Sequence, residues 1–434
     1  MPPAGRAPGR PKPARRPLGG PTGVPAGRGV DMRAGRGVDM IYLDHNATTP
    51  PSPQAVQAVL AAMQQAWANP SSVHGPGQTA RRLLAAARAQ VAQLLACQPV
   101  EVVFTSGANE ANHLAVLGAL ARGRASGRRR LLLSAVEHAG LLALAERLRS
   151  EGTPVDLIPV DGLGRLDLAR AAELMGPDVA LLSVQAANNE TGVCMPLAEL
   201  AELAGAHGVP FHSDATQAVG KLRLRFDGSG ADLWSLSAHK LQGPKGVGAL
   251  LLRKGLSWPA LISGRQERGR RGGTENLPGI AGFGAAAEQL AATLDDDLPR
   301  ITALRERLET GLLALGGPLP PQAQGQTQVQ VQVHGLGAPR LANTVSWRLG
   351  QVDAERVLNA FERGGVVASS GAACSAGGQQ ASPVLRALGL TEAQARAGLR
   401  FSLGRSSTAQ EIDQVLALAC QVLPTLQAEA CCSA

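Results

Sequence analysis

The strongest constraint on the fold is a regular alternation of short apolar runs and helix-like segments over residues 53–290. Helical periodicity is clear in residues 80–95 and 140–149, where apolar residues recur every three or four positions. The apolar runs predict buried strands at residues 101–105, 131–135, 155–160, 179–185, 209–212, 232–236 and 246–252. Because strand and helix follow each other repeatedly, we expect an α/β fold with a mainly parallel sheet and helices on both faces.

The pattern changes after residue 290 and indicates a smaller α+β domain in the C-terminal part of the chain. Its expected elements are an acidic helix at 295–315, strands at 326–334 and 343–348, and helices at 353–363 and 407–423. We therefore divide the chain into an N-terminal extension, a large domain, a small domain and a tail, at residues 1–39, 53–290, 41–52 with 291–425, and 426–434.

The basic character of the chain is concentrated in its first 39 residues. They hold eight basic and two acidic residues, whereas the other 395 residues hold 34 basic and 32 acidic ones. This even balance gives no reason to expect direct nucleic-acid binding. Because 17 of the first 39 residues are Gly or Pro, we predict a disordered extension, or a region upstream of a true start at Met32 or Met40.

The compartment follows from two further patterns. No apolar run approaches the roughly 20 residues that a membrane-spanning helix needs, and the extension lacks the apolar stretch of a secretory signal. The six cysteines show no CxxC spacing, so we predict neither a disulfide framework nor a metal site. We expect a cytoplasmic protein, and the sequence assigns no function to Cys431 and Cys432 in the tail.

Polar clusters follow three of the predicted strands, where open α/β sheets bind their ligands. Residues 104–110 lead through a glycine turn into a helix, which is either a phosphate cradle or a plain helix cap. Asp214 follows a second strand as a strand-end carboxylate or another cap. Lys240, one of five lysines, follows a third strand; it is either a desolvated amine nucleophile toward an aldehyde or part of a surface ion pair.

A phosphate cradle, a carboxylate and a lysine are together what pyridoxal 5′-phosphate (PLP) requires. At this point the chain resembles the cysteine desulfurases of the NifS/IscS-like group, which are class-V aminotransferases among the fold-type I PLP enzymes. The matching motifs occur in family order over roughly residues 41–420. They are 42–50 (YLDHNATTP), 69–72 (NPSS), 105–110 (TSGANE), 136–138 (VEH), 188–192 (NNETG), 214–217 (DATQ), 237–240 (SAHK), 266–268 (QER) with 273–276 (GTEN), 369–374 (SSGAAC) and 400–405 (RFSLGR).

The resemblance implies a role for each matching residue. Lys240 would bind PLP covalently and move protons at the substrate α-carbon, and His138 would stack on the cofactor ring and assist these transfers. Asp214 would pair with the ring nitrogen, and Asn189 and Gln217 would bind near the ring oxygen. Asn189 would also contact the substrate, and Arg400 would bind its carboxylate. The phosphate would be held by Ala108, Asn109, Ser237 and His239, and by Thr274 from a neighbouring subunit of a homodimer.

The resemblance also implies that Cys374 takes sulfur from L-cysteine as a persulfide, releases L-alanine, and passes the sulfur to an acceptor protein. The acceptor would serve iron–sulfur cluster assembly or tRNA thiolation. Small residues surround Cys374 and predict a mobile loop. This loop also resembles that of selenocysteine lyases, so selenocysteine is an alternative substrate. A plain aminotransferase and a non-catalytic sulfur-transfer scaffold are further alternatives, although neither requires Lys240, Asp214, His138 and Cys374 together.

Overall fold

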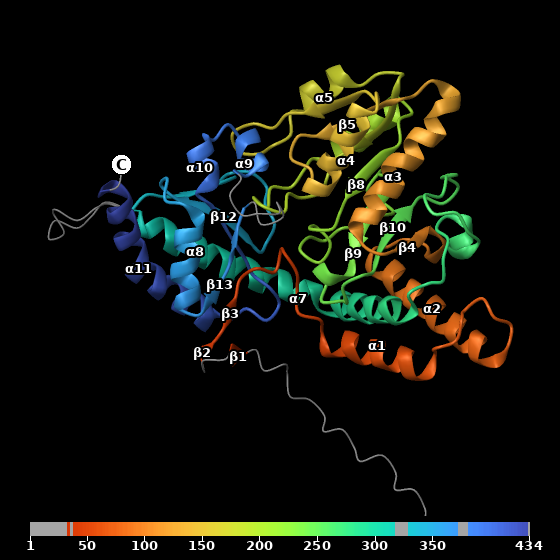
Figure 1. Ribbon diagram of the computed structural model, residues 1–434, viewed down its shortest axis with the longest axis horizontal. Coiled ribbons are helices and arrows are strands. Elements are labelled where there is room, and N and C mark those ends of the chain that lie inside the picture. Colours follow the sequence, from red (N-terminus) through yellow and green to blue (C-terminus); the bar gives the residue numbers. More distant parts are fainter. Residues whose placement is uncertain (1–32, 35–37, 317–328, 372–380, 433–434) are drawn as a thin grey trace, which may run out of the picture.

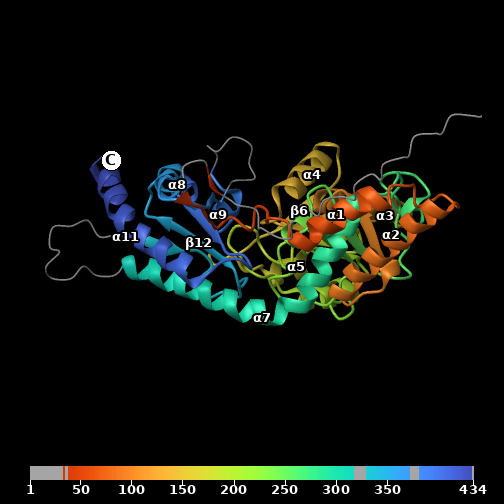
Figure 2. The same ribbon diagram turned by 90° about the horizontal axis from the view of Figure 1, so that it is seen from below.

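A computed structural model describes residues 33–34, 38–316, 329–371 and 381–432 of the chain. A larger and a smaller β-sheet each have their own hydrophobic cluster, and one long helix runs past both (Figures 1 and 2). The expected α/β class with a mainly parallel central sheet is confirmed. Within the described ranges, none of the helices combines the length and the apolar character that crossing a membrane requires.

The larger sheet has seven strands in the order β4-β10-β9-β8-β7-β5-β6. Neighbouring strands from β5 to β9 run parallel, whereas β10 is antiparallel to both β9 and β4. Only residues 238–247 separate β9 from β10, which is too few for a crossover helix, so β10 returns in the opposite direction. The strands are β4 (Val102–Thr105), β5 (Arg130–Ser134), β6 (Val155–Ile158), β7 (Val179–Ser183), β8 (Phe211–Asp214), β9 (Leu233–Ser237) and β10 (Gly248–Leu252).

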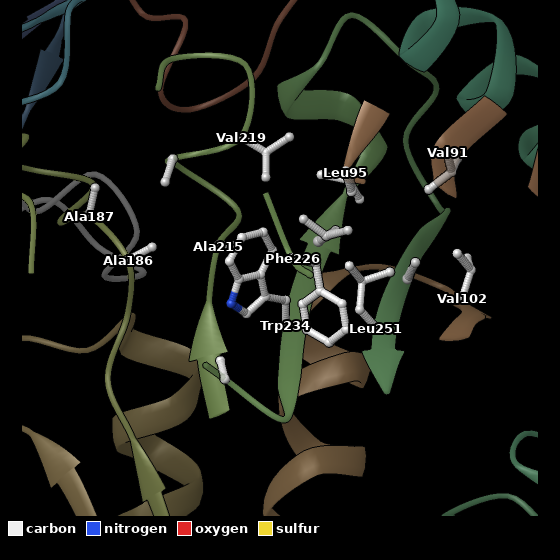
Figure 3. Packing of buried hydrophobic residues seen from close by; sticks show 14 of the residues in the cluster. Val91, Leu95, Val102, Ala186, Ala187, Ala215, Val219, Phe226, Trp234 and Leu251 are labelled. Carbon is white, nitrogen blue, oxygen red and sulfur yellow. The ribbon is translucent and has the colours of Figure 1, made fainter. Parts of the chain in front are cut away.

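Helices cover both faces of this sheet. Successive residues of a strand point to opposite sides, and the apolar residues on both sides are buried under helices. In β4, Phe104 joins the cluster under one set of helices and Val103 joins the cluster under the other. The first set is α2 (Gly75–Leu94), α5 (Leu168–Leu174), α6 (Leu197–Ala206) and the start of α7; the second is α3 (Ala108–Gly123) and α4 (Ala139–Ser150). On the first face, Trp234 meets Phe226 edge-on with ring centroids 5.3 Å apart (Figure 3).

Helix α7 (Leu277–Leu315) is longer than the helix that we expected at 295–315. Its first turns contain several glycines, which lower helix propensity and concealed it in the sequence. A Cβ at Gly282 would lie 2.7 Å from Val59 of α1 (Pro53–Gln65), and one at Gly284 would lie 2.7 Å from Ala87 of α2. Close packing against these two helices therefore outweighs the low propensity.

The smaller sheet is antiparallel, with its four strands in the order β11-β12-β15-β14. Trp347 and Phe401 pack at its centre with ring centroids 5.4 Å apart. The N-terminal β3 (Ile41–Tyr42) pairs with β13 (Val366–Val367) beside this sheet. The remaining elements here are β11 (Val331–Val333), β12 (Thr344–Leu349), β14 (Ser369–Ser370), β15 (Gly398–Ser402), α8 (Ala354–Arg363), α9 (Pro383–Ala387), α10 (Glu392–Arg396) and α11 (Ala409–Cys432). Our domain limits stay a prediction, since α7 crosses the expected border at residue 290.

Three elements near chain ends and gaps differ from the sequence expectation. Helix α11 continues past residue 423 into the predicted tail, because Leu423 and Leu426 extend its buried stripe across Pro424. In the predicted disordered extension, β1 (Arg33–Ala34) pairs with β2 (Val38–Asp39) in a two-residue antiparallel ladder. Strand β11 is shorter than expected, and part of the predicted strand at 326–334 lies outside the described residues.

Candidate active site

A cavity of about 560 Å³ opens at the carboxyl ends of strands β4, β5, β7, β8 and β9. This volume lies within the roughly 300–1,000 Å³ typical of small-molecule sites. The parallel strands end at the same edge of the sheet and therefore bring distant parts of the sequence together. Nine of the residues that the sequence analysis proposed line this cavity: Ala108, Asn109, His138, Asn189, Asp214, Gln217, Ser237, His239 and Lys240.

Lys240 enters the cavity from the short turn that follows β9. Its Nζ donates hydrogen bonds to the backbone oxygens of Asn46 and Ala47, the second at 2.8 Å. The N-terminal segment that contains these two carbonyls thus lies directly over the amine. Sequence analysis found Lys240 but not Asn46 as its contact, because almost two hundred positions separate the two residues.

Asp214 ends strand β8, which runs beside β9. Its carboxylate oxygens accept hydrogen bonds from the Asn112 side chain at 2.8 Å and from the Thr216 backbone N–H at 3.0 Å. Two donors therefore hold a nearly buried carboxylate in place at the cavity wall. Strand β8 leads into a turn that the Thr216 contact closes, and no helix begins there in the described chain, so the alternative of a helix cap is wrong.

Glu137 is a second carboxyl group near Asp214 that sequence analysis did not single out. Full burial, together with the negative charge of Asp214, raises the pKa of Glu137 well above its usual range. One oxygen accepts from the backbone N–H of Gln185 at 2.7 Å, and the other has no partner among the described residues. Burial therefore disfavours the charged form of Glu137.

The turn from β4 into α3 also lines the cavity. Ser106 donates its backbone N–H to Glu110 at 2.8 Å, which fixes the turn, and Ala108 and Asn109 supply the first turn of the helix. A Cβ at Gly248 would lie 2.7 Å from Gly107, so the neighbouring strand approaches this turn as closely as a glycine allows. Free N–H groups at a helix start, with Ser237 and His239 opposite, form a donor set that suits an anion.

His138 begins helix α4 and lines the cavity. Its Nδ1 accepts a hydrogen bond from the Gly140 backbone N–H at 3.1 Å. A backbone N–H can only donate, so in the neutral ring the proton must lie on Nε2. His138 therefore caps the start of helix α4 and also lines the cavity, so the two alternatives are both correct.

Arg400 lies beside the cavity but is not among the residues that line it. Its guanidinium is buried, forms an ion pair with Asp44 at 2.6 Å, and donates to the backbone oxygen of Asn189 at 3.0 Å. Its Nε has no partner among the described residues. The expected substrate-binding arginine is thus next to the site, but it is already paired with Asp44. The sequence analysis did not predict this ion pair.

The last two predicted site residues lie apart from this cavity. Thr274 is exposed, and it is not among the lining residues of its own chain. Cys374 falls between the described ranges, so its position is not part of the structure. The preceding strand β14 pairs Ser369 with Arg400, which brings the chain close to the site just before Cys374. Over the residues that the structure covers, no group of three or more His, Cys, Asp or Glu side chains could hold a metal ion.

Comparisons with known proteins agree with this geometry. Residues 41–415 match the family described as aminotransferase class-V. A cysteine desulfurase of Cereibacter sphaeroides is 45% identical over 389 residues, which cover 89% of this chain and 95% of that protein. The cysteine desulfurase NifS of Azotobacter vinelandii is 41% identical over 378 residues, covering 87% of this chain and 90% of that protein.

Solved structures agree as well. A NifS-like protein matches with a TM-score of 0.80 at 29% identity and covers 89% of this chain and 100% of its own. A structure described as SspA in complex with cysteine matches with a TM-score of 0.72 at 29% identity, over 85% of this chain and 100% of that one. The family resemblance drawn from the sequence motifs is confirmed by these matches.

Proposed function

This chain belongs to the class-V aminotransferase family as a cysteine desulfurase, and we propose that it transfers sulfur from L-cysteine to Cys374. In this reaction, L-cysteine and the Cys374 thiol give L-alanine and a Cys374 persulfide. The observation that carries the proposal is the convergence of Lys240, Asp214 and the start of α3 on one cavity. It is tested by measuring alanine and persulfide from cysteine, with selenocysteine as the competing substrate.

The residues of the cavity fit PLP in the chemistry of their donors. Lys240 supplies the amine, Asp214 a carboxylate for the ring nitrogen, and the start of α3 with Ser237 and His239 the donors for a phosphate. Gln217 and Asn189 also line the cavity, and they would bind the ring oxygen. When bound, PLP supplies an electron sink that stabilises negative charge on the substrate carbon atoms.

The protein residues would then perform the remaining tasks. Lys240 would move a proton at the substrate α-carbon. His138 carries its proton on Nε2 when neutral, which suits donation toward the ring or the substrate. Arg400 would bind the substrate carboxylate through its Nη2 atom, in place of Asp44, whose ion pair with that atom the substrate would displace.

The first prediction concerns Asp214. We expect Asp214→Asn to lower the turnover number by roughly 10²- to 10³-fold, as for the loss of one electrostatic contact at a reacting centre. The neutral amide cannot stabilise a positive charge on the ring nitrogen, while Lys240 still binds the cofactor. Steady-state kinetics and the visible spectrum measure the two effects separately. Asp156→Asn, far from the cavity on β6, is the matched control; an active Asp214→Asn enzyme would contradict the assignment.

We also propose a homodimer that uses the exposed face of helix α1. Val56, Leu60 and Met63 lie on one side of this helix, and Trp67 follows in line just after its end. Their exposed fractions rise from 38% at Val56 to 75% at Trp67. A contiguous apolar stripe of this kind favours association over exposure to water. Binding of a second copy to this stripe would be consistent with the expected role of Thr274, which is exposed here and would contact the phosphate in the neighbouring subunit.

The second prediction tests this surface. The double substitution Met63→Glu and Trp67→Glu places two charges in the apolar stripe, so it should convert the dimer to monomers at micromolar concentration. Light scattering on the purified protein measures the mass. Gln65→Glu adds a charge to the opposite side of the same helix and should leave the dimer intact. A doubly substituted protein that stays dimeric would place the interface elsewhere.

The destination of the sulfur is the last part of the proposal. One matching relative is a NifS protein, and we propose that this chain likewise delivers its persulfide sulfur to an acceptor protein in the cytoplasm. Iron–sulfur cluster assembly and tRNA thiolation are the two routes that this chemistry could supply. Transfer of labelled sulfur from Cys374 to a purified scaffold protein would distinguish the two.

A further inference from the structure

A second lysine lies deep in the wall behind the cavity. Lys221 is 8% exposed, and its Nζ donates to Asn46 Oδ1 at 2.8 Å and to Gln217 Oε1 at 2.5 Å. Both contacts are uncharged, and over the described residues no carboxylate forms an ion pair with it. The charged groups that act on it are Lys240 and Arg400, and burial with these positive charges lowers the pKa of Lys221 well below its usual range.

A lysine at such a position is costly, because burying an amine without a counter-charge loses its hydration. Packing of the Lys221 side chain does not explain why this cost is tolerated. A methionine would fill the same space without burying an amine. The two hydrogen bonds are therefore the property of Lys221 that a hydrophobic residue could not provide. One of them goes to Gln217, which lines the cavity.

The contacts of Gln217 fix the orientation of its amide from both sides. Its Nε2 donates to the backbone oxygen of Asn46 at 2.9 Å, and a carbonyl oxygen can only accept. Its Oε1 must then face the other way, where Lys221 donates to it. Nε2 carries two hydrogens, of which the Asn46 contact uses one. The second N–H has no other partner among the described residues and remains for a group in the cavity.

We propose that Lys221 is a positioning residue of the cofactor site, which holds the Gln217 amide so that an N–H faces the ring oxygen of bound PLP. The proposal rests on the PLP function argued above. It also assigns Asn46 a double role: its backbone oxygen receives both Gln217 and Lys240, and its side-chain oxygen receives Lys221. The two lysines are thus linked through one residue of the N-terminal segment.

Lys221→Met tests the proposal, because methionine keeps the length of the side chain and removes its donors. The full-length dimer is titrated with PLP and followed by visible absorbance. Without Lys221 the Gln217 oxygen loses its donor, and only the Asn46 contact still orients the amide. We expect the PLP dissociation constant to rise about tenfold, the value of one well-formed hydrogen bond, and the pH at which the visible band changes to shift. Lys254→Met, at an exposed lysine, is the matched control.

A double-mutant cycle with Gln217→Leu separates positioning from a general structural role. If Lys221 acts through Gln217, Lys221→Met should change the dissociation constant less than about twofold once Gln217 is leucine. Full additivity of the two substitutions would overturn the proposal, and so would wild-type binding and an unshifted band in Lys221→Met. Should Lys221→Met fail to fold, Lys221→Gln retains an N–H donor and should show a smaller loss. A wild-type protein that binds no PLP would instead refute the proposed function itself.

Discussion

Lys240→Ala is expected to abolish the yellow colour of the purified protein and to lower alanine release from cysteine by about 10³-fold or more. The substitution removes both the covalent attachment of the cofactor and the base that moves protons at the substrate α-carbon. PLP itself can still enter, because Asp214, Ser237 and His239 remain in the cavity wall. Visible spectroscopy and an alanine assay on the same preparation measure the two losses.

The control for this prediction is Lys254→Ala, which removes an exposed lysine outside the cavity. That variant should keep both the colour and the activity of the wild type. Addition of a small primary amine should partly restore turnover in Lys240→Ala, because it can replace the missing proton carrier. If Lys240→Ala retained the unchanged spectrum of the wild type, another amine would have to bind the cofactor.

Cys374→Ser should leave the colour unchanged but eliminate persulfide from the protein. Only a thiolate attacks the substrate sulfur readily, and a serine hydroxyl at this position is not ionised. We expect alanine release to fall by roughly 10³-fold or more, as for the removal of a nucleophile in other enzymes with a covalent intermediate. Mass spectrometry after one turnover, with and without a reductant, detects the bound sulfur.

Two other cysteines supply the comparison for Cys374. Burial raises the pKa of Cys97 to about 12 and that of Cys194 to about 11, so both thiols stay protonated at neutral pH. Cys97→Ser and Cys194→Ser should therefore retain the full persulfide signal on Cys374. Persulfide that persisted in Cys374→Ser and disappeared from Cys194→Ser would assign the acceptor role to Cys194 instead.

The sequence predicted the large sheet well because most of its strands are buried on both faces and read as short apolar runs. It also placed Asp214 and Lys240 at strand ends, and neighbouring parallel strands necessarily bring such ends together. The start of α7 could not be recognised in the same way. Its glycines argue against a helix locally, and only the close approach of α1 and α2 explains them.

The parts of the site that the sequence did not predict are those that depend on distant contacts. Asn46 lies within a recognisable motif, but nothing local shows that it accepts hydrogen bonds from Lys240, Lys221 and Gln217, which are far away in the sequence. Glu137 precedes His138 in another motif, yet its raised pKa follows only from full burial beside Asp214. A residue type can suggest a role, whereas burial and partners are set by the folded chain.

The central claim is that the cofactor is attached to Lys240. Reduction of the native protein with borohydride, followed by proteolysis and mass spectrometry, identifies the lysine that carries the pyridoxyl group. The account predicts one modified peptide, with the label on Lys240 and none on Lys221, which is buried behind the cavity. A label on Lys221, or no labelled peptide from protein supplied with PLP, would contradict it.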